Sequence, residues 1–210
     1  VQWCGIVVVR APRLFRMIEV EKNFAVTAKD KARLVKGAIL LYKKKFTDVY
    51  YDSPDYALTG KDFWLRTREG EFELKVPQNI GNISKRTTDQ YEELETDVEI
   101  AHALKLPVEK PLAEAVREKG FVPFATIMTT RERYQKGDFH LDFDEMDFGF
   151  IAFEVELMVA RIENIPAAEK RIITFGIEHH INPESAGKVI EYLRRYRPEH
   201  FVFLQSRDVA

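Results

Sequence analysis

Pairs of glutamates separated by one residue are the first sign of chemistry in this chain. Glu19 and Glu21 stand in IEVEKNF, and Glu154 and Glu156 stand in FEVEL. Successive side chains of a β-strand point to opposite faces, so each pair shares one face of a strand while apolar residues occupy the other. Neighbouring like charges repel, and a compensating ion is therefore expected beside each pair. Carboxylate oxygens are the ligands that hard divalent cations prefer.

Arginine pairs occupy other segments. Arg66 and Arg68 share a face with Trp64 in FWLRTRE, and Arg131 and Arg133 lie together in TTRERY. A surface shaped only for solubility would intersperse the two signs, whereas here they are sorted by segment. The same alternation groups further polar residues on two more strand faces: Glu71, Glu73 and Lys75, and His140, Asp142 and Asp144.

The simpler alternative for any one of these segments is a half-solvated strand of an antiparallel sheet. If the sheet instead closes into a barrel with its charged faces inward, acidic strands could hold divalent cations and basic strands an anion. A metal ion together with a polyphosphate would satisfy both.

The elements that must position these residues are mainly strands. Alternation predicts two hairpins, with turns at EGE and at Lys136-Gly137, and the second continues through Gly149 as a meander. Lys43, Lys44 and Lys45 are interpreted as a solvated loop. The predicted strands cover 17–26, 46–52, 62–68, 71–76, 124–134, 138–144 and 150–159.

Helical patterns fall between and after the strands. Thr27 is a plausible N-cap for the first, and the last is predicted to start at Asn182-Pro183 and stop at Pro198. His179-His180 is interpreted as a surface or capping pair at a helix end. The predicted helices cover 27–37, 95–106, 110–120, 166–180 and 182–198, which indicates one compact α+β unit.

Composition excludes several classes of protein. The chain has 210 residues, 32 Lys and Arg against 34 Asp and Glu, and a formal net charge of −2, so no general basic field favours nucleic acid or a membrane surface. Cys4 is the only cysteine, which suits a reducing, cytoplasmic location. No apolar run approaches the roughly 20 residues of a membrane-spanning helix. A soluble monomer is expected.

The first 16 residues carry Arg10, Arg13 and Arg16 and no acid. That bias suits a targeting segment, but the segment is short and poor in serine. The favoured interpretation is an extension upstream of a start at Met17 that is not part of the fold. A single domain is then expected over 17–210.

Taken in order, the motifs resemble the CYTH superfamily, the triphosphate tunnel metalloenzymes. The resemblance covers residues 17–204 and is closest to the animal thiamine triphosphatases. It implies an α+β fold with an eight-stranded antiparallel β tunnel and peripheral helices. It also implies hydrolysis of thiamine triphosphate to thiamine diphosphate and phosphate with Mg²⁺, or Mn²⁺, as cofactor. The motifs are IEVEKNF, TDVYYDSP, FWLRTRE, FELKVP, QYEEL, TTRERY, LDFDEMDFGFIAFEVEL and AGKVIEYLRRYRPEHF.

The resemblance also implies roles for single residues. Trp64 matches the aromatic residue that packs against the thiamine, and Glu93 is a further acidic wall residue. Catalysis would fall to Glu154, Glu156 and Lys75. The implied metal ligands are Glu19, Glu21, Asp142, Glu154 and Glu156, and the implied phosphate contacts are Arg66, Arg68, Lys75, Arg131 and Lys188.

One departure matters for function. The superfamily signature is E-x-E-x-K, but Asn23 stands at the lysine position, and Lys22 is one residue early and is predicted to point out of the tunnel. Asn23 can still donate a hydrogen bond to phosphate, with roughly half the strength of a charge-assisted one. Two alternatives therefore stay open: an inorganic tripolyphosphatase and a non-catalytic protein that binds triphosphate or polyphosphate. Adenylyl cyclase activity also occurs in the superfamily, but no residue here favours it.

Overall fold

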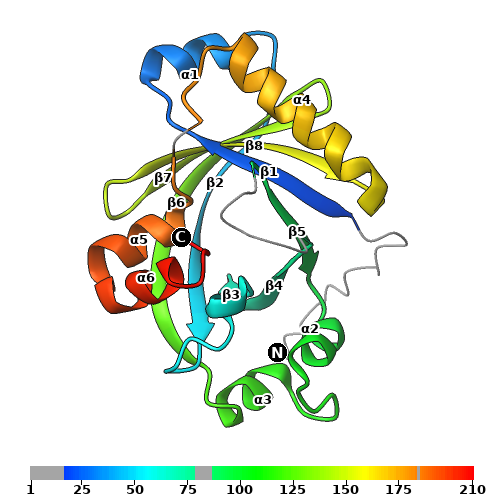
Figure 1. Cartoon of the computed structure of the whole chain (residues 1–210), viewed down its shortest axis with the longest axis vertical. Coiled ribbons are helices and arrows are strands. Elements are labelled where there is room, and N and C mark those ends of the chain that lie inside the picture. The colour runs from blue at the N-terminus through cyan, green and yellow to red at the C-terminus, as the bar shows by residue number, and fades with distance from the viewer. Residues whose placement is uncertain (1–16, 79–86, 184) are drawn as a thin grey trace, which may run out of the picture.

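The computed structural model describes residues 17–78, 87–183 and 185–210. Its centre is a closed antiparallel barrel of eight strands in the order β1-β5-β4-β3-β2-β6-β7-β8, which confirms the predicted tunnel fold (Figure 1). The predicted extension over residues 1–16 lies outside the described residues. The strands are β1 (Ile18–Phe24), β2 (Ile39–Asp52), β3 (Trp64–Arg68), β4 (Glu71–Pro77), β5 (Asp89–Leu94), β6 (Val122–Lys136), β7 (Phe139–Met146) and β8 (Ile151–Val159).

Six α-helices and two 3₁₀ turns connect and cover these strands in the described residues. No helix within those residues is both long and apolar enough to span a membrane. The helices are α1 (Ala28–Leu34), α2 (Asp97–Leu104), α3 (Leu112–Glu118), α4 (Ile165–Glu178), α5 (Lys188–Tyr196) and α6 (Pro198–Gln205), and the 3₁₀ turns are η1 (Thr59–Lys61) and η3 (Ile162–Asn164).

The turns follow the predicted chemistry. Glu69 and Gly70 join β3 to β4, both with positive φ (53° and 93°), as a two-residue hairpin turn of type I′ requires. Gly137, with φ of 61°, lies in the turn between β6 and β7, and β7 continues through Gly149 into β8. Both hairpins and the meander are confirmed.

Two strands differ from the prediction. β2 begins at Ile39, because its first half pairs with β6 from Ile39↔Gln135 onward, so the lysine run 43–45 lies in a strand and not in a loop. Adjacent leucines followed by three lysines hide the alternation on which strand prediction depends. β5 was not predicted as a strand for a similar reason: most residues of DQYEEL are polar, so no alternation of apolar and polar residues is visible.

The outer face of the barrel is covered by two helical layers. α4 lies across β1 and β8, with Phe24 so close to the helix that a Cβ at Gly176 would lie 2.5 Å from its ring. α2 and α3 cover the opposite side, where Ile100 and Val116 pack with Leu65 and Leu74 of β3 and β4. Figure 1 shows these layers at opposite ends of the view. On the strands beneath these helices, apolar residues therefore face outward and charged residues face inward.

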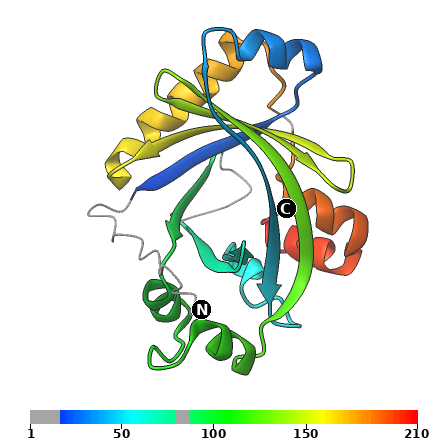
Figure 2. The same ribbon diagram turned by 180° about the vertical axis from the view of Figure 1, so that it is seen from behind.

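α5 and α6 lie beside the long strands β2 and β6 (Figure 2). Val189 of α5 packs against the cluster that contains Tyr50 and Ile127 from the inner face, and Leu193 shares a cluster with Trp64. The predicted helix start at Asn182-Pro183 was wrong, because α5 begins at Lys188 with Gly187 as its extended N-cap. Pro198 does stop α5, but it also opens α6, where the missing N–H of a first-turn proline costs nothing.

Candidate active site

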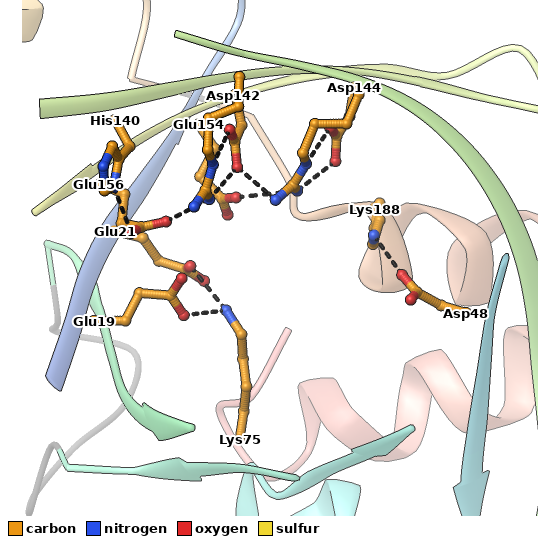
Figure 3. A network of polar contacts seen from close by, with 12 residues as sticks. Glu19, Glu21, Asp48, Lys75, His140, Asp142, Asp144, Glu154, Glu156 and Lys188 are labelled. Atoms are coloured by element: carbon orange, nitrogen blue, oxygen red, sulfur yellow. Dashed lines mark hydrogen bonds and ion pairs between the residues drawn. The ribbon is translucent and has the colours of Figure 1, made fainter. Parts of the chain in front are cut away.

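The barrel encloses a cavity of about 1030 Å³, and every residue predicted for the site lines it. Sequence reasoning had placed all of these residues except Glu93 on six strands and one helix. The closed sheet turns the strand residues inward, and α5 brings Lys188 to the same cavity. Figure 3 shows the charged groups facing one another across the space. The predicted residues in the lining are Glu19, Glu21, Asn23, Trp64, Arg66, Arg68, Lys75, Glu93, Arg131, Asp142, Glu154, Glu156 and Lys188.

The acidic wall consists of Glu19, Glu21, Glu154 and Glu156 on the neighbouring strands β1 and β8. Glu21 lies opposite Glu156 in the register, and all but Glu154 are buried. The ammonium of Lys75 lies 2.5 Å from Glu19 and 2.8 Å from Glu21 (Figure 3). One lysine thus faces two carboxylates.

The pKa values of this wall show that the single lysine is insufficient. Burial alone would raise the pKa of Glu19, but Lys75 lowers it to about 2. Burial and repulsion from Glu154 and Glu19 raise the pKa of Glu21 well above its ordinary value. Burial raises the pKa of Glu154 to about 7 and, with repulsion from Glu19, also raises the pKa of Glu156. The wall therefore holds more carboxylates than its cations neutralise.

Arginines of β6 face aspartates of β7. Arg131 donates two hydrogen bonds to Asp144, at 2.6 and 2.7 Å, and Arg133 donates two to Asp142, at 2.7 and 2.5 Å. Arg133 also reaches Glu156 at 2.8 Å, and Arg131 lies 3.7 Å from Glu154. The like-signed pairs read from the sequence are thus compensated by opposite pairs on the next strand. Arginine side chains therefore supply part of the positive charge that was expected, from the sequence, to come from a bound ion.

The cationic wall consists of Arg66, Arg68, Arg131 and Lys188. Asp48 of β2, fully buried, accepts hydrogen bonds from Arg68 (2.7 and 3.1 Å) and Lys188 (2.7 Å). Burial would raise the pKa of Asp48, but Lys188, Arg66 and Arg68 hold it far below its ordinary value. Asp48 therefore stays ionised and acts as the shared counter-ion of these cations.

Arg66 is the second buried anchor of this wall. It donates hydrogen bonds of 2.8 Å to Glu73 and to Glu93. Glu93, expected as an acidic wall residue, is thus partly neutralised.

The aromatic residue predicted to pack against an organic group is fixed in place by hydrogen bonding. Trp64 Nε1 donates to Asp62 at 2.8 Å, and the Tyr91 hydroxyl donates to the same carboxylate oxygen at 2.8 Å. Trp64 and Tyr91 also share a hydrophobic cluster with Leu193. This end of the cavity is consequently apolar on one side and bordered by the charged groups of β3 on the other.

Asn23 lies inside the cavity beside the start of α5. It is 8% exposed, pairs with Glu154 in the register, and its amide nitrogen would lie 3.6 Å from a Cβ at Gly187. Lys22 borders the cavity as well, but its ammonium bonds the Thr87 carbonyl at 2.7 Å in an exposed contact. It therefore supplies no charge beside Glu154, where the signature lysine is missing.

The donors of the cavity suit a divalent cation. Among the described residues, fourteen Asp and Glu and only eight Lys and Arg line it. As the side chains lie here, no three His, Cys, Asp or Glu of residues 17–78, 87–183 and 185–210 form a group that could hold a metal ion, since Lys75, Arg131 and Arg133 take several of the carboxylates. The excess of buried carboxylates with raised pKa nevertheless indicates a demand for added positive charge, and oxygen-only donors fit Mg²⁺ or Mn²⁺.

Several residues of the network were missed as site residues. Arg133, His140 and Asp144 were on the charged faces that alternation identified, and His140 lies 3.1 Å from Glu156. Asp48 carried a weaker signal, since it lies two residues before Tyr50 on the same strand face, and Tyr50 also lines the cavity. His179 lies at the C-terminal cap of α4, in agreement with its interpretation.

The chain is similar to known proteins in both sequence and fold. Thiamine-triphosphatases of Homo sapiens and Macaca fascicularis are each 28% identical over 204 residues, covering 88% of this chain and 88% of the relative. Among solved structures, the PH1819 protein of Pyrococcus horikoshii OT3 has a TM-score of 0.63 at 22% identity, covering 85% of this chain and 99% of its own.

A second solved structure is a putative adenylyl cyclase from Hippeastrum, described as having a dominant triphosphatase activity. It has a TM-score of 0.54 at 17% identity, covering 85% of this chain and 95% of its own. At these identities the structural likeness concerns the fold. The model of the CYTH domain family matches residues 17–186, and the chain therefore belongs to that family.

Proposed function

We propose that the protein is a metal-dependent triphosphate hydrolase that converts thiamine triphosphate to thiamine diphosphate and phosphate. The observation that carries the proposal is that one cavity joins three features: an acidic wall short of positive charge, a cationic wall, and Trp64 beside them. Family membership and the thiamine-triphosphatase relatives support the same reaction.

Glu19, Glu21, Asp142, Glu154 and Glu156 would hold the divalent cation, Mg²⁺ or Mn²⁺. A bound divalent cation supplies charge neutralisation at phosphate oxygens and orients them for in-line displacement.

The cationic wall would hold the phosphate chain. Arg66 and Arg68 project from the same face of β3 as Trp64. A substrate whose phosphates bind the arginines could therefore stack its organic group on the indole of Trp64. Lys188 reaches the same region from the start of α5. Lys75 adds a cation between the two walls.

A carboxylate of the acidic wall would accept the proton of the attacking water. Glu154 and Glu156, the crowded pair on β8, are the candidates for this role, since burial raises the pKa of both carboxyls and a carboxyl that the cation does not occupy would keep a raised pKa. Asn23 would donate a neutral hydrogen bond where the family signature has a cation. Phosphoryl transfer depends on positioning and charge, so this substitution favours the second candidate, a binding protein without turnover.

The test is phosphate release from thiamine triphosphate and from inorganic tripolyphosphate, each with Mg²⁺ and with chelator. Hydrolysis that requires metal and prefers thiamine triphosphate is the expected result. Trp64→Ala should then raise the KM for thiamine triphosphate about tenfold or more while changing tripolyphosphate turnover little, since only the former has an aromatic head to stack. A preference for tripolyphosphate would assign the inorganic substrate, and tight binding without release would assign a binding protein. The predicted monomeric state and cytoplasmic location stay predictions.

A further inference from the structure

Phe46 lies on the inner face of β2, buried to 3% exposure, with cations gathered around its ring. The distances from ring centroid to cation are 4.2 Å for the Arg68 guanidinium, 5.2 Å for the Lys188 ammonium and 5.8 Å for the Arg131 guanidinium. Lys44 of the same strand lies at 5.4 Å. These groups come from β3, α5, β6 and β2, so segments far apart in the chain meet at one ring.

Among the described residues, no single carboxylate is hydrogen-bonded to all of these cations. Asp48 hydrogen-bonds Arg68 and Lys188, whereas Asp144 hydrogen-bonds Arg131 from another strand. The ring of Phe46 contacts both sets. It therefore connects two ion-pair groups that face the cavity from different sides of the barrel.

An aromatic face has a chemical property that suits this position. Its quadrupole attracts a cation, most strongly where water is excluded, yet it carries no net charge. A further carboxylate would also hold these cations, but it would cancel charge that a phosphate chain needs. Leucine would fill similar space without attracting them.

We propose that Phe46 is a positioning residue for the triphosphate reaction, which holds Arg68, Arg131 and Lys188 in one arrangement while leaving their charge available to the phosphate chain. The inference rests on the proposed function for the identity of the anion. Phe46 would then determine affinity for the phosphate chain although it does not itself contact the reacting atoms.

The test replaces Phe46 in two ways in the full chain. Phe46→Leu removes the aromatic face, and 3,4,5-trifluorophenylalanine at position 46 keeps the ring shape while withdrawing electron density from its face. Phe175→Leu, on the buried face of α4 and away from the cavity, is the control for loss of a buried aromatic side chain. The measurements are the Kd of inorganic tripolyphosphate in chelator, KM and kcat with Mg²⁺, and Tm.

Phe46→Leu is expected to raise the Kd and KM about tenfold and the fluorinated ring about threefold, with a smaller change in kcat. Phe175→Leu should lower Tm without changing the Kd. The inference is overturned if the fluorinated ring leaves the Kd unchanged, or if Phe46→Leu changes only Tm, as the control does. Failure of the wild-type protein to bind either tripolyphosphate or thiamine triphosphate would instead overturn the proposed function, and this inference with it.

Discussion

Both walls of the cavity contain enclosed carboxylates, but the pKa values of these carboxylates are shifted in opposite directions on the two walls. On the cationic wall, Asp48 is surrounded by Arg66, Arg68 and Lys188, and its pKa lies far below the ordinary value. On the acidic wall, Glu21 is buried and Glu154 is half-buried, but their pKa values are raised because burial and the neighbouring carboxylates outweigh the nearby cations. A buried carboxylate with sufficient partners is part of the scaffold, whereas one without them is a site that requires a ligand.

Neutralising the acidic wall should give the largest effect on activity. Glu154→Gln with Glu156→Gln should lower metal-dependent kcat/KM by about 10³-fold or more, because two of the proposed metal donors and the proposed proton acceptor are lost. The same variant should keep or raise Tm, by about 2–4 °C, since repulsion is relieved. Glu71→Gln, an exposed acid on the same cavity, is the control. Full activity of the double variant would refute the assignment of this wall.

Neutralising the counter-ion of the cationic wall should act in the opposite direction on stability. Asp48→Asn leaves the buried cations without their shared partner and should lower the free energy of unfolding by about 3–5 kcal/mol in urea titrations. Tripolyphosphate should recover part of this loss, because an anion bound to the native state stabilises it. Asp138→Asn, which removes an exposed pair with Arg171, should change stability by less than about 0.5 kcal/mol. Equal effects at both sites would remove the distinction between the walls.

A smaller effect is expected where the walls meet. Asn23→Lys adds a cation beside Glu154 and should increase triphosphate affinity about five- to tenfold, judged by calorimetry in chelator and by KM. Unchanged affinity would indicate that Lys75 already supplies what the signature lysine supplies elsewhere. Lys22→Gln, which alters a neighbouring lysine bonded to Thr87, is the matched control.

The smallest effect concerns the support of β2 behind the cationic wall. His200 of α6 bonds Thr59 at 2.7 Å and stacks on Tyr56, and Thr59 in turn bonds Asp52 at the end of β2. Burial, which outweighs the attraction of Asp52, lowers the pKa of His200 from 6.5 to about 4. The unfolded chain therefore binds a proton before the folded one does. The stability from neutral His200 is complete above pH 6.5 and is lost as the pH falls to 4.

His200→Gln should consequently show a shallower fall in Tm over that interval, by about 2–4 °C. The comparison is made by thermal denaturation of both proteins from pH 7.5 to 4. Identical slopes for the two would show that another group dominates acid sensitivity.

Much of the site follows from alternation along single strands, and the rest depends on which strands become neighbours. Glu19 and Glu21 must share a face in any strand, so their common face was predictable from spacing, whereas its inward direction was expected only if the sheet closed into a barrel. Asp48 can hydrogen-bond Arg68 only because the β2–β3 register places the two residues opposite each other. It can hydrogen-bond Lys188 only because α5 begins at that residue. Neither is encoded in local spacing. The barrel itself was expected from the resemblance, while alternation failed at β5 and at the first half of β2, where charge replaces the apolar period.

The helices beside β2 and β6 also contribute to the charge of the cavity. α5 packs in clusters with Tyr50 and Trp64, two residues that line the cavity, and Lys188 at its start donates a hydrogen bond to Asp48 at 2.7 Å. One cation of the cavity therefore comes from a helix that follows the last strand of the barrel. Undocking of α5 would remove that cation without altering any strand, so the electrostatic potential inside the barrel depends on the packing of its C-terminal helices.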